Sequence, residues 1–172
     1  MAQHGSQNGP HDGDSGNLQY DNAFWRFSLA VYGQDDVARE CLALQETLGI
    51  DVNVLLFCAW LGARGISLSG ADIEDTLGKV AAWHGSVVRP LRGVRQWIKT
   101  LKREEFASFR ERVKRLELDA EQIEQAVLFA HSGSIRTAAG VDRAEAISHN
   151  VKQYLKTASA PLLIAAAQRN GA

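Results

Sequence analysis

Apolar and polar positions alternate with helical spacing along most of the chain, but one stretch has no polar side. Between Val52 and Ala63 the sequence VNVLLFCAWLGA contains no charged residue and one strongly polar residue, Asn53. A helix that is apolar on all sides must be buried. The pattern therefore predicts a buried central helix, residues 51–64, around which the rest of the chain packs.

Apolar residues recur every three or four positions on both sides of this stretch, which predicts further amphipathic helices. Glycines follow several of these helices, and glycine commonly ends a helix because it adopts the left-handed backbone conformation easily. No segment reads as a β-strand, and the apolar residues after Pro161 are expected to form a terminal turn on the core. The additional helices are expected at about residues 22–32, 34–48, 71–84, 86–102 and 141–157.

Residues 103–131 carry the most regular pattern in the chain. A helix of this length would be about 43 Å long at 1.5 Å per residue. It would span the whole domain with an unbroken apolar seam whose members step alternately by three and four residues. The seam consists of Phe106, Phe109, Val113, Leu116, Ala120, Ile123, Val127 and Ala130.

These elements predict an all-α fold: one compact helical bundle of about six to seven helices, formed by residues 21–172. A chain of 172 residues is an ordinary length for one domain. Residues 1–20 are rich in Gly, Ser, Asn, Gln and Asp and have almost no aliphatic residues. Such a segment buries too little surface to offset its ordering entropy, so it is predicted to be a disordered tail.

The sequence predicts a cytoplasmic protein without membrane insertion. The N-terminus lacks the basic and apolar regions of a secretory signal, and the longest apolar run, Val54 to Leu61, is far shorter than the roughly 20 residues of a membrane span. Cys41 and Cys58, the only cysteines, fall in apolar helical contexts and are interpreted as buried free thiols.

Charge is unevenly distributed although the net charge is only -1. Residues 86–116 contain 10 Lys and Arg against 3 Asp and Glu, whereas residues 1–85 contain 4 against 11. A basic helical surface of this kind can bind an acidic protein or nucleic-acid phosphates, and the alternative is a set of ordinary solvated helix faces. Trp97 is expected next to the apolar seam of its own helix, residues 86–102, so base stacking is not indicated. The candidate binding residues are Arg89, Arg92, Arg95, Lys99, Lys102 and Arg103.

Two acidic clusters suggest a different function. In a helical protein, carboxylates from two facing helices can hold Mg²⁺ for a diphosphate substrate. Both clusters also fall in first helical turns, where the helix dipole favours acidic residues, and this simpler explanation is preferred. The clusters are Asp35, Asp36 and Glu40, and Asp72, Glu74 and Asp75.

Polar residues of the central helix have structural explanations. Asp51 is expected to be its N-cap and Arg64 a charge that complements the dipole at its C-terminus. Asn53, if buried, must be hydrogen-bonded and is expected to tie the helix to a neighbouring backbone; Trp60 lies on the same helix. The histidines His84, His131 and His149 have no metal-ligating partner three or four residues away, and we expect no catalytic residue, metal site or cofactor.

Four sequence blocks resemble an uncharacterised family of small conserved hypothetical proteins from proteobacteria. The blocks are FWRFSLAVYG, CLALQETLGIDVNVLLFCAWLGARG, VVRPLR and LELDAEQIEQAVL, and the resemblance covers about residues 22–158. It implies a bacterial, cytosolic, all-helical protein and supplies no catalytic residues.

The combined prediction is a non-enzymatic interaction or regulatory protein that binds a protein partner, or nucleic acid, through its basic helical surface. A Mg²⁺-dependent enzyme acting on a phosphorylated or diphosphate metabolite is the alternative. The sequence leaves the oligomeric state open.

Overall fold

The computed structural model describes residues 18–135 and 141–171, and every regular element within them is helical. The predicted all-α fold is thus confirmed. The elements are α1 (Ala23–Tyr32), α2 (Asp35–Leu48), α3 (Val52–Ala63), α4 (Gly70–Trp83), the π-helix η1 (His84–Val88), α5 (Arg89–Thr100), the 3₁₀-helix η2 (Glu104–Phe106), α6 (Ala107–Ser132), α7 (Arg143–Leu155) and α8 (Pro161–Asn170).

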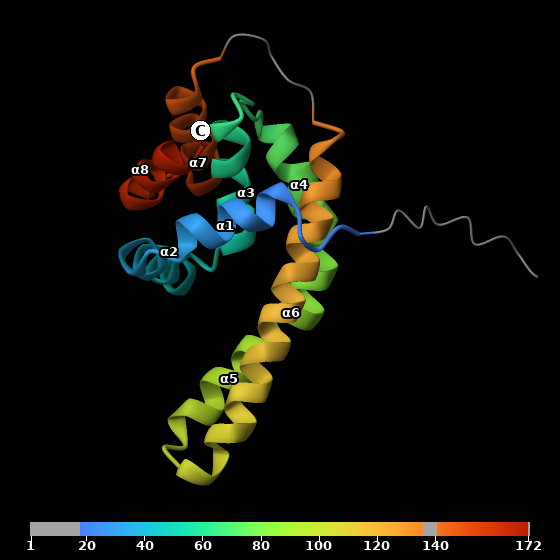
Figure 1. Ribbon diagram of the computed structural model, residues 1–172, viewed down its shortest axis with the longest axis vertical. Helices are drawn as coiled ribbons and strands as arrows, with labels where there is room; N and C mark the ends of the chain where they lie inside the picture. Colours follow the sequence, from blue (N-terminus) through green and yellow to red (C-terminus); the bar gives the residue numbers. More distant parts are fainter. Residues whose placement is uncertain (1–17, 136–140, 172) are drawn as a thin grey trace, which may run out of the picture.

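The helices form a head from which a pair of helices projects (Figure 1). α1, α2, α3, α7 and α8 gather at one end, while α4, η1 and α5 follow one another as a rod that runs beside α6. Beyond η1, α5 packs chiefly against α6. We call residues 89–118, which comprise α5, η2 and the facing half of α6, the arm, and the remaining helices the head.

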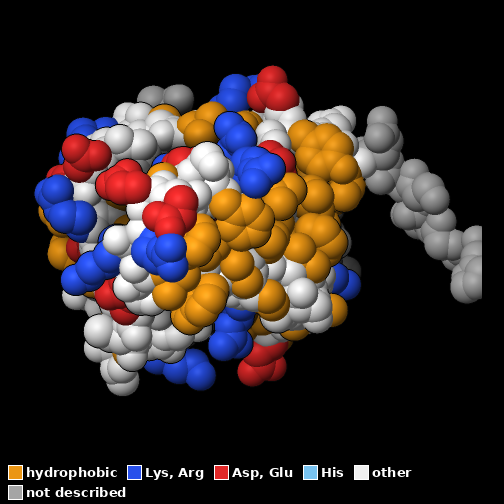
Figure 2. Space-filling view, turned by 90° about the horizontal axis from the view of Figure 1, so that it is seen from below, with side chains coloured by type: hydrophobic (Ala, Val, Ile, Leu, Met, Phe, Trp, Pro, Cys, Tyr) orange, Lys and Arg blue, Asp and Glu red, His pale blue; other side chains and the backbone are white. Residues whose placement is uncertain are grey.

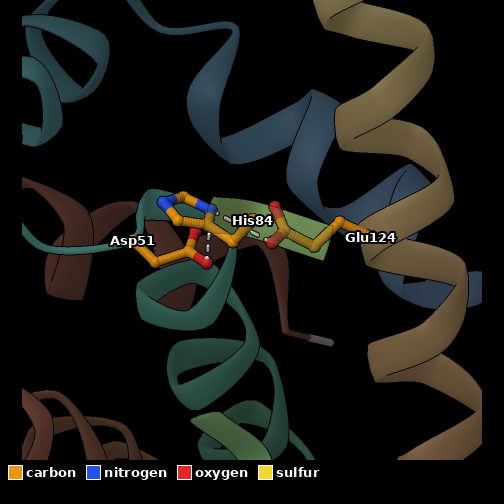
Figure 3. Close-up of side chains that lie close together, drawn as sticks. All are labelled: Asp51, His84 and Glu124. Carbon is orange, nitrogen blue, oxygen red and sulfur yellow. Dashed lines mark hydrogen bonds and ion pairs between the residues drawn. The ribbon is translucent and has the colours of Figure 1, made fainter. Parts of the chain in front are cut away.

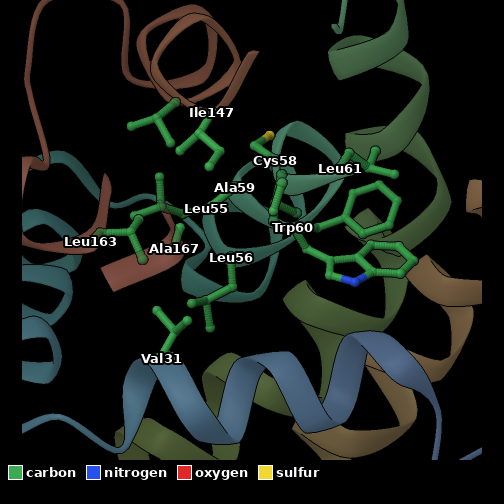
Figure 4. Packing of buried hydrophobic residues seen from close by; sticks show 14 of the residues in the cluster. Val31, Leu55, Leu56, Cys58, Ala59, Trp60, Leu61, Ile147, Leu163 and Ala167 are labelled. Carbon is green, nitrogen blue, oxygen red and sulfur yellow. The ribbon is translucent and has the colours of Figure 1, made fainter. Parts of the chain in front are cut away.

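The predicted buried central helix is confirmed, because all twelve residues of α3 are buried. α1, α2, α6, α7 and α8 contact it, and its side chains point outward in all directions into apolar surroundings (Figure 4). Leu55 lies on the side of Ile147 and Leu163, and Leu56 points toward Val31. Burial on every side explains why this stretch needs no polar face.

Asn150 of α7 fastens the C-terminal end of α3 and the loop that follows it. The side chain is completely buried, and its Nδ2 donates to the carbonyls of Cys58 (3.1 Å) and Ile66 (2.8 Å). Its Oδ1 accepts from the backbone N–H of Leu68 (2.8 Å). The loop after α3 therefore has backbone groups satisfied by one side chain, as buried polar groups must be.

Two details differ from the sequence predictions. The expected break at Gly85 is absent: η1 joins α4 to α5, and the N–H of Arg89 donates to the carbonyl of His84, five residues earlier. The segment after Pro161 is a helix of ten residues, α8, instead of a terminal turn. The predicted disordered tail lies, up to residue 17, outside the described residues.

The predicted apolar seam of the long helix is only partly correct for the arm. Val113 is buried as predicted, but Phe109 and Leu116 are 48% and 55% exposed, and Glu117, which is not a seam residue, is buried. The periodicity identified the helix correctly, but α5 covers only one side of α6, and the wide apolar stripe extends beyond that side. Within the described part of the chain, no helix is long and apolar enough to span a bilayer.

Gly62 allows α3 and α7 to approach each other closely. A Cβ atom at this position would lie 2.5 Å from both the Cα and the N of Ile147. A side chain here would have to push the backbone of α7 away, because no flexible group can move aside.

We therefore expect Gly62→Ala to lower the free energy of unfolding by about 1–3 kcal/mol, the usual cost of overpacking. Gly78 is the matched control: it lies in α4, and a Cβ atom added to it would meet no described atom within 4 Å. Gly78→Ala should raise stability by up to about 1 kcal/mol, because alanine is the better helix former. Urea unfolding of both variants checks this; equal effects would contradict the close packing of α3 on α7.

Candidate functional site

Two of the six predicted surface cations face the interior of the arm. Arg92 donates to Glu117 (Nε–Oε1, 3.0 Å) and Glu121 (Nη2–Oε1, 2.5 Å), and Arg95 forms a two-pronged pair with Glu117. Their side chains are 14% and 22% exposed, and that of Glu117 is 6% exposed. These pairs lock α5 to α6.

The surroundings shift the pKa values of Glu117 and Glu121 in opposite directions. Burial favours the neutral form of Glu117, but its hydrogen bonds to Arg95 and Arg92 outweigh burial and lower its pKa. For Glu121, burial dominates over the contacts with Arg92 and raises the pKa above its ordinary value.

The other four predicted binding residues, Arg89, Lys99, Lys102 and Arg103, are exposed along the arm. Arg103 pairs with Glu105 and lies over the ring of Phe106, 5.1 Å from its centre. The six residues thus serve two purposes: two hold the arm together and four supply positive charge to its surface.

The arm exposes large apolar side chains among these charges. Trp97 is 63% exposed, so the prediction that it lies against the apolar seam was wrong. Viewed from the end of the arm, apolar side chains form a broad patch with Lys and Arg at its margins (Figure 2). The exposed members on the arm are Val94, Trp97, Phe109, Leu116 and Leu118.

Cations lie directly beside this apolar surface. The guanidinium of Arg112 stands over the ring of Phe109, 5.4 Å from its centre. Arg112 and Arg115 also line a shallow depression together with Leu116, Leu118 and Asp119. An apolar surface bordered by positive charge is thereby presented to solvent.

A cavity of about 340 Å³ opens where the arm meets the head. Leu118 lines both this cavity and the shallow depression, so the two adjoin. Most of the cavity wall is apolar, and Lys114 adds a positive charge. Its lining residues include Trp25, Leu29, Tyr32, Leu42, Leu56, Arg92 and Arg95.

Three buried polar atoms of the cavity-lining residues have no hydrogen-bond partner within the described part of the chain. They are Oγ of Ser28, Nε2 of Gln45 and Oε1 of Gln125. A buried polar group without a partner costs about 1–3 kcal/mol. All three belong to residues that line the cavity, but the atoms themselves are buried, so a bound molecule would reach them only if neighbouring side chains moved.

A buried polar cluster lies behind the cavity, where α3, η1 and α6 meet (Figure 3). Nδ1 of His84 lies 3.0 Å from Oδ2 of Asp51 and 3.1 Å from Oε1 of Glu124. Burial alone would lower the pKa of His84, but the contacts with both carboxylates outweigh it and raise the pKa to about 9. Burial raises the pKa of Glu124.

Asn53 connects this cluster to the cavity. Its Nδ2 donates to Oε2 of Glu124 (2.6 Å), and its Oδ1 accepts from Nε2 of Gln125 (2.8 Å), a cavity residue. The sequence predicted a tie to a neighbouring backbone, whereas the partners are two side chains of α6. Asn53 thus joins the buried helix to α6.

Asp51 and Arg64 lie at the two ends of the central helix, and Trp60 lies in the core. Asp51 is the N-cap of α3, its Oδ1 accepting from the N–H of Asn53 (2.8 Å). Trp60 packs against Phe24, Phe57 and Phe129 in the core. Arg64, at the C-cap, lies over the Trp60 ring, 4.9 Å from its centre.

Two of the six acidic residues considered for Mg²⁺ satisfy backbone N–H groups at helix starts. Asp72 forms a capping box with Ser69 at the start of α4, and Glu40 accepts from the N–H groups of Leu162 and Leu163 at the start of α8. Among residues 18–135 and 141–171, the one group offering three ligand atoms within 4.8 Å is Asp51, His84 and Glu124. None of the six clustered acids belongs to it.

Sequence reasoning missed this group because its members are 33 and 40 residues apart. The one usable signal was the polar pair of Asp51 and Asn53 at the start of an otherwise apolar helix. A buried Asn needs partners, but nothing in the spacing identified His84 or Glu124 as those partners.

The chain matches one known protein family over more than half of its length. Residues 23–128 match the family described as "Protein of unknown function (DUF2390)". The protein belongs to this family. The matched segment begins with α1 and ends in the second half of α6, so it includes the arm, the cavity-lining helices and all three cluster residues. No curated protein and no solved structure gives a significant match.

Replacement of Glu117 should reveal how strongly the arm depends on its buried ion pairs. Glu117→Gln leaves two half-enclosed guanidinium groups without full charge compensation, and we expect a loss of about 3 kcal/mol in the free energy of unfolding. Glu111→Gln is the control, because Glu111 pairs with Arg110 at the surface and is 54% exposed; its effect should stay below about 1 kcal/mol. Urea unfolding measures both, and similar losses would contradict the structural role of Glu117.

The His84 cluster should make stability fall in alkaline solution. The folded-state pKa of about 9 exceeds the ordinary value of 6.5, so the stabilisation is complete below about pH 6.5 and is lost as the pH rises through 9. The loss is on the order of 3 kcal/mol, at about 1.4 kcal/mol per pKa unit. NMR titration of the imidazole in the presence of EDTA, assigned with a His84→Gln variant, tests the cause; a midpoint at or below 6.5 would refute it.

Proposed function

We propose that this is a non-enzymatic binding protein of the bacterial cytosol whose arm receives an acidic amphipathic helix of a partner protein. The observation that carries the proposal is the apolar surface of the arm, where Trp97, Leu116 and Phe109 are each about half exposed or more. Exposed apolar patches bordered by charge are typical of protein interaction sites. Aromatic residues and arginine are the types that most often dominate binding energy in such sites.

The architecture of the arm supports this proposal. α5 packs chiefly on α6. A pair of helices buries only the faces that the two turn toward each other, so apolar side chains on the other faces of the pair stay exposed. A third helix laid along the arm would cover the apolar side chains that the head does not reach. This is the helix-in-groove mode of recognition, in which apolar residues at positions i, i+3, i+4 and i+7 supply the contacts.

Charge complementarity determines the chemistry of the partner. The segment 86–116 carries 10 Lys and Arg against 3 Asp and Glu, and Arg112 and Arg115 border the apolar depression. Glutamates and aspartates flanking the apolar stripe of the partner would pair with these cations and accelerate association. A second copy of the arm would instead bring like charges together.

The adjoining cavity gives the partner an anchoring point. Leu118 leads from the depression into the cavity, where one large side chain of the partner could be buried. A few deeply buried side chains carry most of the binding energy of a specific interface, whereas non-specific apolar contacts lack such anchors.

A defined probe tests the proposal: a synthetic helical peptide with Leu and Phe at i, i+3, i+4 and i+7 and Glu at most other positions. Fluorescence anisotropy should show binding that weakens as salt is raised, because exposed charge pairs are screened. Trp97→Ala and Leu116→Ala should each weaken binding about tenfold or more, as loss of a central contact does. Thermal stability should be unchanged, since both side chains are exposed.

Three controls make the result specific. Leu162→Ala removes another exposed leucine, 43% exposed on α8 of the head, and should leave binding intact. A peptide with Lys in place of Glu should bind far more weakly. Tighter binding of a labelled DNA or RNA oligonucleotide than of the acidic peptide would overturn the proposal in favour of nucleic acid.

A further inference from the structure

We propose that Asp51, His84 and Glu124 form a binding site for one divalent transition-metal ion. The three residues come from the start of α3, from η1 and from α6, and their ligand atoms converge on one point (Figure 3). The inference does not depend on the partner helix proposed above, because the cluster lies in the head and shares no residue with the exposed surface of the arm.

The distances from His84 Nδ1 to the two carboxylate oxygens suit a shared metal ion as well as they suit hydrogen bonds. Nδ1 of His84 lies 3.0 Å from Oδ2 of Asp51 and 3.1 Å from Oε1 of Glu124. Transition metals bind imidazole nitrogen and carboxylate oxygen at about 2.0–2.2 Å, and two ligands at right angles around such an ion are about 3.0 Å apart. Each oxygen therefore already stands at the separation of a neighbouring ligand from the nitrogen, and all three atoms lie within 4.8 Å of one another, so small shifts would admit an ion between them.

Asn53 aligns both carboxylates for this purpose. Its backbone N–H donates to Oδ1 of Asp51 (2.8 Å), and its Nδ2 donates to Oε2 of Glu124 (2.6 Å). The outer oxygen of each carboxylate is thus occupied, while the inner oxygen faces His84. Outer hydrogen bonds that orient the ligands in this way are characteristic of protein metal sites.

One inner oxygen accepts no hydrogen bond from the described residues. Asp51 is 7% exposed, and its Oδ2 is fully buried without a hydrogen-bond partner, although it lies 3.0 Å from the imidazole nitrogen. A single N–H on Nδ1 can point at only one acceptor at a time, and its geometry suits Glu124. A metal ion bonds to all three atoms at once, which removes this unsatisfied group.

The backbone at His84 provides a second indication. His84 is the first residue of η1, a five-residue π-helix between two α-helices. π-helical turns are rare and occur frequently at functional sites. The turn places His84 opposite the N-cap of α3, and the side chain of His84, at 15% exposed, is the most accessible of the three and offers an ion a short path from solvent.

The ligand set defines the class of ion. One nitrogen and two carboxylate oxygens without a thiolate suit Mn²⁺, Fe²⁺, Co²⁺ or Zn²⁺. Mg²⁺ and Ca²⁺ favour oxygen ligands throughout, and Cu⁺ favours sulfur. With three protein ligands, an ion would retain positions for water or another small ligand.

Calorimetric titration of the full chain with Mn²⁺ and with Zn²⁺ tests the proposal, and the visible spectrum of added Co²⁺ reports the ligands. The expected result is one ion per chain, a rise in melting temperature and a d–d spectrum typical of mixed nitrogen and oxygen ligation. Glu124→Gln and Asp51→Asn keep the shape of each side chain and should weaken binding by about 100-fold. Circular dichroism establishes that each variant is folded.

Two matched variants exclude other ligands. Asp75→Asn alters a second carboxylate–histidine pair, Asp75 and His131, whose atoms are 3.7 Å apart; it should bind the ion as the wild type does. The chain also has histidines at positions 4 and 11, within residues 1–20, and a His4→Ala and His11→Ala double variant should bind normally as well. Failure of the wild type to bind any of the three ions at millimolar concentration, or undiminished binding by folded Glu124→Gln, would overturn the proposal.

Discussion

The burial of α3 on every side is the constraint on which the rest of the fold depends. Its twelve residues carry one strongly polar side chain and leave no surface that water could wet. Five helices, α1, α2, α6, α7 and α8, are therefore used to cover it, with α7 pressed against Gly62. Because those helices are committed to the head, α5 and the facing half of α6 have little except each other to pack against. The arm, with its exposed apolar residues, is a consequence of how the other helices are placed.

Two buried amide side chains fasten this central helix to its neighbours. Asn150 satisfies the backbone at its C-terminal end, and Asn53 joins its N-terminal end to α6. Each amide bonds to groups on segments that are distant in sequence. Such bonds specify how the helices are arranged, because a sliding helix would leave several buried groups unpaired at once.

Sequence reasoning recovered what local signals determine and missed what distant contacts determine. The span of α3 followed from composition, and its capping by Asp51 from the preference of helix starts for aspartate. The direction in which Trp97 and Leu116 point could not be predicted, because periodicity identifies an apolar stripe without saying whether a neighbour covers it. The approach of His84 to Glu124 depends on the α4–α6 pairing, which no spacing along the chain encodes.

The π-helix η1 also sets the direction in which the arm displays its surface. A π-turn amounts to one additional residue within a helix, and each residue of an α-helix turns the chain by about 100°. Every side chain of α5 beyond Val88 is therefore rotated relative to those of α4. Loss of a single residue from this turn would keep the rod continuous yet swing Arg92 and Arg95 away from Glu117. The extra residue of η1 thus sets the rotation of the arm relative to the head. Deleting one residue of η1 would alter recognition without removing a binding side chain.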